Sequence, residues 1–189
     1  MSQAKNLPTS WNYPAAGLGI VIIVLVAAAL LLPWYHNSTT NFIDDRTDST
    51  DLYLTKYVWR HGSAEAVVGG YSSQGSEELS ELMSQESMLL IVGLVFPAMS
   101  VLLSRGGWNR WGAIVGAIAA IILFALMANF FWRITGAIGA TWSSFSGEEV
   151  SKSFSKSWGP MVGWFLPLIG CITQSAQVVV LAYSSEGKP

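Results

Sequence analysis

The sequence predicts an all-α membrane protein, a bundle of four transmembrane helices with a small extracellular β-hairpin in its first outer loop. Only 12% of the 189 residues are charged, which is about half the share found in ordinary soluble domains. The apolar residues are gathered into four long blocks, and a helix needs roughly 20 such residues to cross a bilayer. Several of the nine tryptophans lie at the ends of these blocks, where indole rings mark membrane interfaces.

The first span is predicted over 15–34, after an N-terminal segment at 1–14. Its apolar part contains no charged side chain, and aromatic residues lie on both sides of it: Trp11, Tyr13, Trp34 and Tyr35. A cleaved signal peptide is the alternative. It is disfavoured because only Lys5 precedes the apolar stretch, which is longer than a usual signal sequence and has no small-x-small site after it.

Three further spans are predicted at 88–103, 111–132 and 160–183. None of the four predicted spans contains Asp, Glu, Lys, Arg or His. Pro97 and Pro167 lie inside two of them and are expected to bend their helices, since neighbouring helices can satisfy the carbonyl groups that a proline frees.

The charges predict the orientation of the chain. The loop at 104–110 is short and purely basic, with Arg105 and Arg110. It shares one side of the membrane with 1–14 and 184–189, and the positive-inside rule makes that side the cytoplasm. The prediction is a multi-pass protein of the plasma membrane with both termini cytoplasmic, although the longer outer side also carries basic residues.

Two polar segments of unequal length lie on the outer side, at 35–87 and 133–159. In the first, β-branched and aromatic residues flank a His-Gly-Ser turn, which predicts a β-hairpin over 51–71. An amphipathic helix is expected over 76–87 and should continue into the second span. Three aromatic side chains of the hairpin are candidates for contact with other proteins: Tyr53, Tyr57 and Trp59.

An internal duplication is one interpretation of the outer segments. Residues 77–80 resemble 148–151, and 92–97 resemble 162–167, at nearly the same offset. The second and fourth spans would then be equivalent helices in a parallel repeat. Chance resemblance between apolar helices is the alternative.

Glycines at small-xxx-small spacing predict close helix packing. Gly112 and Gly116 lie on the third span, and Gly159 with Gly163 repeat the spacing at the fourth. These ridges serve packing within the bundle or, alternatively, a homo-oligomer or partner interface. The amides of the spans, Asn129, Gln174 and Gln177, suit hydrogen bonds between helices better than substrate binding.

No residue set indicates an enzyme, a cofactor or a metal site. The acidic stretch 44–51 lacks the spacing of an EF-hand loop, and His36 and His61 are too isolated for a zinc site. No histidine lies in a span to bind haem, which disfavours a cofactor-bearing respiratory subunit. The formal net charge of −2 does not suggest a nucleic-acid partner.

The layout resembles that of claudin-type tetraspan proteins: four spans, cytoplasmic termini, a large first outer loop with β-strands and a smaller second one. The resemblance is in topology, because the Gly-Leu-Trp motif and cysteine pair of that family are absent here and Trp34 lies next to the membrane. We therefore expect a non-enzymatic membrane scaffold or accessory subunit. It would lie in the lipid bilayer and bind a protein partner or itself; the alternative is a small transporter or channel with paired proline-kinked helices.

Overall fold

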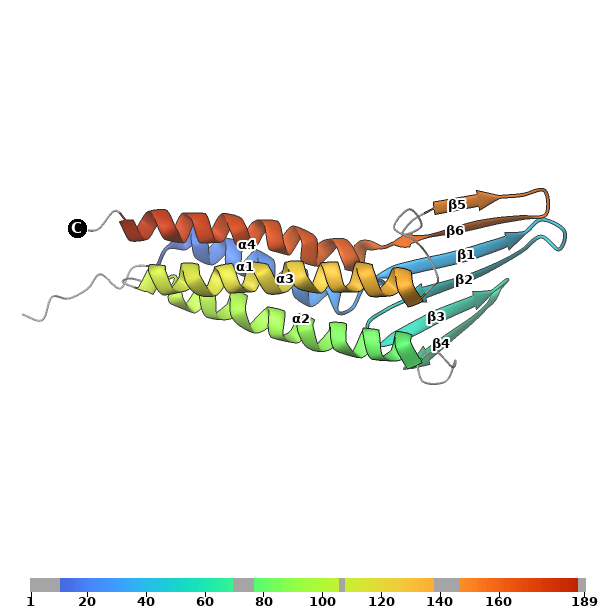
Figure 1. The fold of residues 1–189 in the computed structure, drawn as a ribbon, viewed down its shortest axis with the longest axis horizontal. Coiled ribbons are helices and arrows are strands. Elements are labelled where there is room, and N and C mark those ends of the chain that lie inside the picture. The colour runs from blue at the N-terminus through green and yellow to red at the C-terminus, as the bar shows by residue number, and fades with distance from the viewer. Residues whose placement is uncertain (1–10, 70–76, 106–107, 138–146, 187–189) are drawn as a thin grey trace, which may run out of the picture.

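The computed structural model describes residues 11–69, 77–105, 108–137 and 147–186. Four helices lie side by side, and a six-stranded antiparallel sheet extends from one end of them (Figure 1). The prediction of an all-α fold with one small hairpin is therefore wrong. The helical bundle is present, but the outer part is a sheet built from both outer segments.

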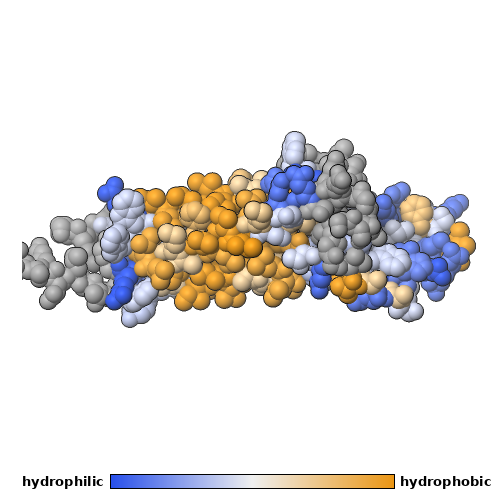
Figure 2. Space-filling model, turned by 90° about the horizontal axis from the view of Figure 1, so that it is seen from below, coloured by the Kyte–Doolittle hydropathy of each residue, from blue (hydrophilic) through white to orange (hydrophobic). Residues whose placement is uncertain are grey.

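The helices are α1 (Tyr13–Ala29), α2 (Glu77–Leu103), α3 (Asn109–Ala137) and α4 (Val162–Glu186). α1 and α3 each pack against both α2 and α4, so the four helices enclose a common core. Three helices are long and apolar enough to cross a membrane, over Glu81–Leu103, Asn109–Ile134 and Val162–Ser185. Figure 2 shows a continuous hydrophobic surface over the helices, with hydrophilic residues at both ends.

α1 is apolar throughout but has only 17 residues. At the start of α1, the Asn12 side chain accepts a hydrogen bond from the backbone N–H of Ala15. Beyond its last residue, the N–H groups of Leu30 and Leu31 donate to the Ala27 and Ala28 carbonyls and extend the helical turn. The chain then reaches Trp34, whose indole donates to the Ala29 carbonyl at 2.7 Å. This bond fixes the direction in which the chain leaves α1.

The hydrophobic core continues from the bundle into the base of the sheet. Trp34 is fully buried and lies edge-on to Phe130 of α3, with 5.0 Å between ring centroids. Tyr35, Leu52 and Tyr57 belong to the same buried cluster as the helix residues. Burial of these side chains attaches the sheet firmly to the bundle.

The sheet has the strand order β4-β3-β2-β1-β6-β5. Its strands are β1 (Tyr35–Asn41), β2 (Arg46–Leu52), β3 (Lys56–His61), β4 (Ala64–Gly69), β5 (Gly147–Val150) and β6 (Phe154–Pro160). β1 of the first outer segment pairs along its whole length with β6 of the second. The two outer segments are therefore one structural unit.

The hairpin expected over 51–71 corresponds to β3 and β4, joined at Gly62. Gly62 has a φ of +55°, a conformation that glycine adopts without steric cost. β1 and β2 were not predicted, because most of their residues are polar on both faces. β5 and β6 of the second outer segment were not predicted either.

α2 begins at Glu77, so the amphipathic segment and the second predicted span form one helix. The candidate membrane span on α2 begins at Glu81, so it includes Glu81 and Glu86 ahead of the uncharged segment predicted at 88–103. The proposed duplication fails at its outer part, since 77–80 are helical whereas Glu148, Glu149 and Val150 form a strand.

Candidate functional site

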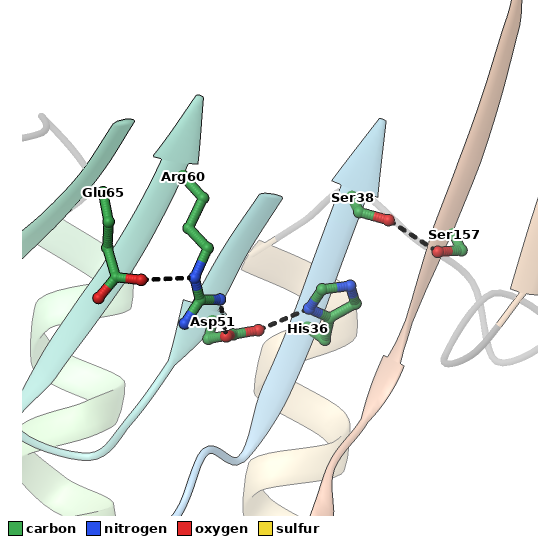
Figure 3. Close-up of polar contacts among 6 residues, drawn as sticks. All are labelled: His36, Ser38, Asp51, Arg60, Glu65 and Ser157. Carbon is green, nitrogen blue, oxygen red and sulfur yellow. Dashed lines mark hydrogen bonds and ion pairs between the residues drawn. The ribbon is translucent and has the colours of Figure 1, made fainter. Parts of the chain in front are cut away.

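The sheet carries a chain of polar and charged side chains that crosses four of its strands. His36 Nδ1 and Asp51 Oδ1 lie 2.5 Å apart. Arg60 donates from Nη1 to the other Asp51 oxygen at 2.5 Å and from Nε to Glu65 at 2.9 Å (Figure 3). The network joins β1 to β4 on one face of the sheet.

Strand register explains why these residues meet. His36 is directly opposite Asp51 in the β1–β2 pair, and Arg60 is opposite Glu65 in the β3–β4 pair. Residues opposite each other in an antiparallel pair lie on the same face. Two residues further along β1, Ser38 meets Ser157 of β6 with 2.9 Å between hydroxyl oxygens.

Contacts within the network shift the pKa values of Asp51 and Arg60. Burial of Asp51 raises its pKa, but its bonds with His36 and Arg60 act in the opposite direction, and the net pKa lies below its ordinary value. The bond to Asp51, and then the bond to Glu65, raise the pKa of Arg60. Asp51 is therefore held as a carboxylate.

The second histidine has an equivalent partner on the opposite face. His61 Nδ1 lies 2.5 Å from Asp48 Oδ1, and its ring stacks on Trp59 with 5.3 Å between centroids. Both histidines are thus held by aspartates of β2. The two histidines are isolated in the sequence, and strand pairing brings each beside an aspartate of the acidic stretch 44–51.

A recess with a volume of about 370 Å³ opens beside the network. His36 and Asp51 form one wall, and residues 157–161, at the junction of β6 with α4, form the other. The recess combines a titratable ring with aromatic and backbone surface. Within the described residues, no group of three or more His, Cys, Asp or Glu side chains could hold a metal ion.

The turn between β1 and β2 presents two adjacent apolar side chains to solvent. Phe42 is 50% exposed and Ile43 is 78% exposed. Backbone bonds hold this turn in place: Phe42 N donates to the Ser153 carbonyl at 2.9 Å, and Ile43 N donates to the Asn41 side chain. The turn is therefore a fixed feature of the sheet.

A buried acidic group lies between the outer parts of α2 and α3. Glu86 is fully buried and accepts a hydrogen bond from Asn129 at 2.5 Å. Its other oxygen, Oε2, has no hydrogen-bond partner in the part of the chain that the structure describes. Arg133 donates to Gln85 at the surface nearby.

A second polar cluster joins all four helices. Gln177 of α4 donates to the Ala15 carbonyl of α1 at 2.8 Å and accepts from Gln174 at 2.6 Å. Ser100 of α2 donates to the Gly112 carbonyl of α3 at 2.9 Å and also lies 3.3 Å from Gln177 Oε1. These side chains connect the helices with one another.

Gly112 and Gly116 lie at close contacts between helices, and Gly163 lies against the segment that follows α1. A Cβ on Gly116 would be 2.8 Å from Gln174 Nε2, and one on Gly112 would be 3.3 Å from the Leu103 backbone. At Gly163 it would be 2.7 Å from the Leu32 and Pro33 carbonyl oxygens. Gly159 is not on a helix but lies in β6 opposite His36.

The remaining predicted residues are dispersed. Pro97 lies near the end of α2, and Pro167 lies near the start of α4. Tyr57 is buried in the core, and Tyr53 lies between strands with Lys56 over its ring. Of the three proposed contact residues, only Trp59 is substantially exposed, at 39%.

The chain matches no protein-family model and no curated protein sequence.

Proposed function

We propose that the chain is a non-enzymatic, multi-span membrane scaffold or accessory subunit that binds protein partners through its outer sheet. In this proposal α1 is a fourth span, both termini are cytoplasmic and the membrane is the plasma membrane. The claudin-type resemblance supports this arrangement by layout.

The pairing of β1 with β6 is the observation that carries the proposal. It merges two segments that are distant in sequence into one sheet, which the buried base attaches to the bundle. Beyond that base the strands bear polar residues on both faces. Burial of apolar side chains therefore contributes little to the stability of the half of the sheet that lies farther from the bundle. A surface held rigidly away from the bundle suits recognition better than support of the fold.

The exposed pair Phe42 and Ile43 is the contact region we propose. Exposed apolar residues rimmed by polar ones are typical of interaction sites. Asp44 and Asp45 follow the pair directly, and Asp45 has a φ of 47°, which belongs to a sharp turn. The turn therefore presents an apolar centre beside acidic residues.

Photo-crosslinking in native membranes tests this function. A photoreactive residue at Ile43 should give protein adducts of discrete mass. The same residue at Ile121, which is 68% exposed on α3, should give lipid adducts instead. Phe42→Ser with Ile43→Ser should remove the protein adducts at a third sheet position, Thr39, without changing the thermal midpoint. Absence of discrete protein adducts at Ile43 would contradict the proposal.

A small transporter is the second candidate, and the buried Glu86 favours it. Ionisable groups within spans often belong to ion or proton pathways. The core beside it is filled by Leu90 and Leu123, which leaves the scaffold as our first proposal. Flux of protons or monovalent cations into proteoliposomes, lost in Glu86→Gln, would reverse this order.

A further inference from the structure

When the candidate spans are placed in a bilayer, as the proposed function requires, the recess beside His36 lies near the level of the lipid headgroups. Met161 in its wall directly precedes the candidate span that starts at Val162. His36 is two residues beyond Trp34, or about 7 Å along a strand. The headgroup layer is roughly 5–8 Å thick on each side of a bilayer, so a lipid headgroup reaches this depth.

The ring of His36 has one nitrogen fixed and one directed to the recess. Nδ1 faces Asp51, whose second oxygen is held by Arg60. In the neutral ring the proton lies on Nδ1, because Asp51 is a carboxylate and accepts it. Nε2 is then a hydrogen-bond acceptor, and Figure 3 shows the second ring nitrogen directed toward β6 and Ser157.

Charge on this face of the sheet suits a cation. Asp51 lines the recess, and Glu148 of β5 is opposite Ser157, on the same face. The nearest basic group of the network, Arg60, is already bound to Asp51 and Glu65. Apart from His36, this face carries three carboxylates, Asp51, Glu65 and Glu148, and two cations, Arg60 and Lys56, so its balance is negative.

We propose that the recess binds the primary ammonium group of a membrane lipid headgroup. His36 Nε2 accepts one ammonium N–H, and the carboxylates nearby stabilise the positive charge. A choline headgroup lacks an N–H and cannot make this bond. Discrimination between ethanolamine-type and choline-type headgroups follows from the acceptor alone.

The charged groups that face the ring are Asp51 on β2, Arg60 on β3 and, beyond Ser157, Glu148 on β5.

Nitrogen NMR of the full chain with labelled histidine rings provides the test. The chain has two histidines, and His61, on the other face and also 2.5 Å from an aspartate, is the internal reference. In nanodiscs, adding phosphatidylethanolamine to phosphatidylcholine should shift the His36 Nε2 signal and leave His61 unchanged.

Three outcomes would overturn the proposal: no shift at His36, equal shifts at both histidines, or the same His36 shift from free ethanolamine in phosphatidylcholine nanodiscs. The last outcome would assign the site to a soluble amine. This measurement uses the unaltered chain, so it does not depend on the folding of a variant. It also leaves the scaffold proposal untouched, since that rests on crosslinking at Ile43.

A matched pair of variants gives an independent measurement. Leucine at position 36 removes the acceptor, and His61→Leu makes the same change on the other face. Native mass spectrometry should detect about tenfold less retained phosphatidylethanolamine on His36→Leu, the effect of one charged hydrogen bond. His61→Leu should retain as much as the unaltered chain. Equal retention by both variants would refute the assignment.

Discussion

Glu86 of α2 accepts a hydrogen bond from Asn129 of α3, and this bond joins two helices at their outer parts. Both side chains lie within candidate membrane spans. Burying an ionised carboxylate costs several kcal/mol unless its oxygens are paired, and Oε2 has no partner in the described part of the chain. The Glu86–Asn129 pair therefore joins the two helices, but burying it costs a substantial free energy of desolvation.

Replacing Glu86 by glutamine should leave the apparent Tm unchanged or higher. The amide oxygen can still accept from Asn129, and the buried ionisable group is removed. Glu86→Ala should lower stability by about 2–4 kcal/mol, because it leaves a cavity and an unpaired amide donor. Thermal unfolding in one detergent compares the two variants, and a larger loss for glutamine than for alanine would contradict this account.

Acid should weaken the outer sheet through Asp51. Its folded-state pKa lies below the ordinary value, so its pairs with His36 and Arg60 stabilise the fold above the unfolded-state pKa of about 3.9. This contribution is lost as pH falls through the folded-state pKa. Asp51→Asn should lose about 1–3 kcal/mol at neutral pH and flatten the acid limb of the unfolding profile. An unchanged acid limb in the variant would exclude Asp51 as the cause.

The helical part of the fold was accessible from the sequence because hydrophobicity along a helix is a local signal. The segments 88–103 and 111–132 fall within α2 and α3. The sheet was not accessible for two reasons. Few residues of β1 and β2 are buried, so their apolar alternation is weak. Val150, Phe154 and Trp158 have a four-residue spacing that fits one face of a helix and also one face of a strand.

The candidate site could not be inferred because it depends on pairing across long sequence distances. His36 meets Asp51 only through the β1–β2 register, and Ser38 meets Ser157 only after the bundle brings β6 beside β1. The high threonine content of 39–50 is a sequence feature typical of strands. The predicted glycines Gly112 and Gly116 do lie at close contacts between helices, where small side chains let helix backbones approach.

Glycine replacements should separate packed positions from free ones. Gly163→Ala places a methyl group 2.7 Å from two backbone oxygens, which cannot move easily, and should cost about 1–3 kcal/mol. Gly17→Ala, with nothing within 4 Å, is the matched control and should be neutral or stabilise α1 by up to about 1 kcal/mol. Apparent Tm values in detergent measure both, and equal effects would show that the close approach at Gly163 is absent in solution.

Cysteine labelling in intact cells should establish which side of the membrane each segment occupies. A membrane-impermeant maleimide should label Thr39→Cys, on the exposed part of β1, but not Ser185→Cys or Ser2→Cys until the cells are permeabilised. The native Cys171 lies within a candidate span and should stay unlabelled, so each introduced thiol gives an unambiguous signal. Since α2, α3 and α4 separate residues 39 and 185, their opposite accessibility reports three spans. Labelling of Ser2→Cys tests α1: if it reacts from outside together with Thr39→Cys, α1 does not cross the membrane, and the four-span arrangement with a cytoplasmic N-terminus is wrong.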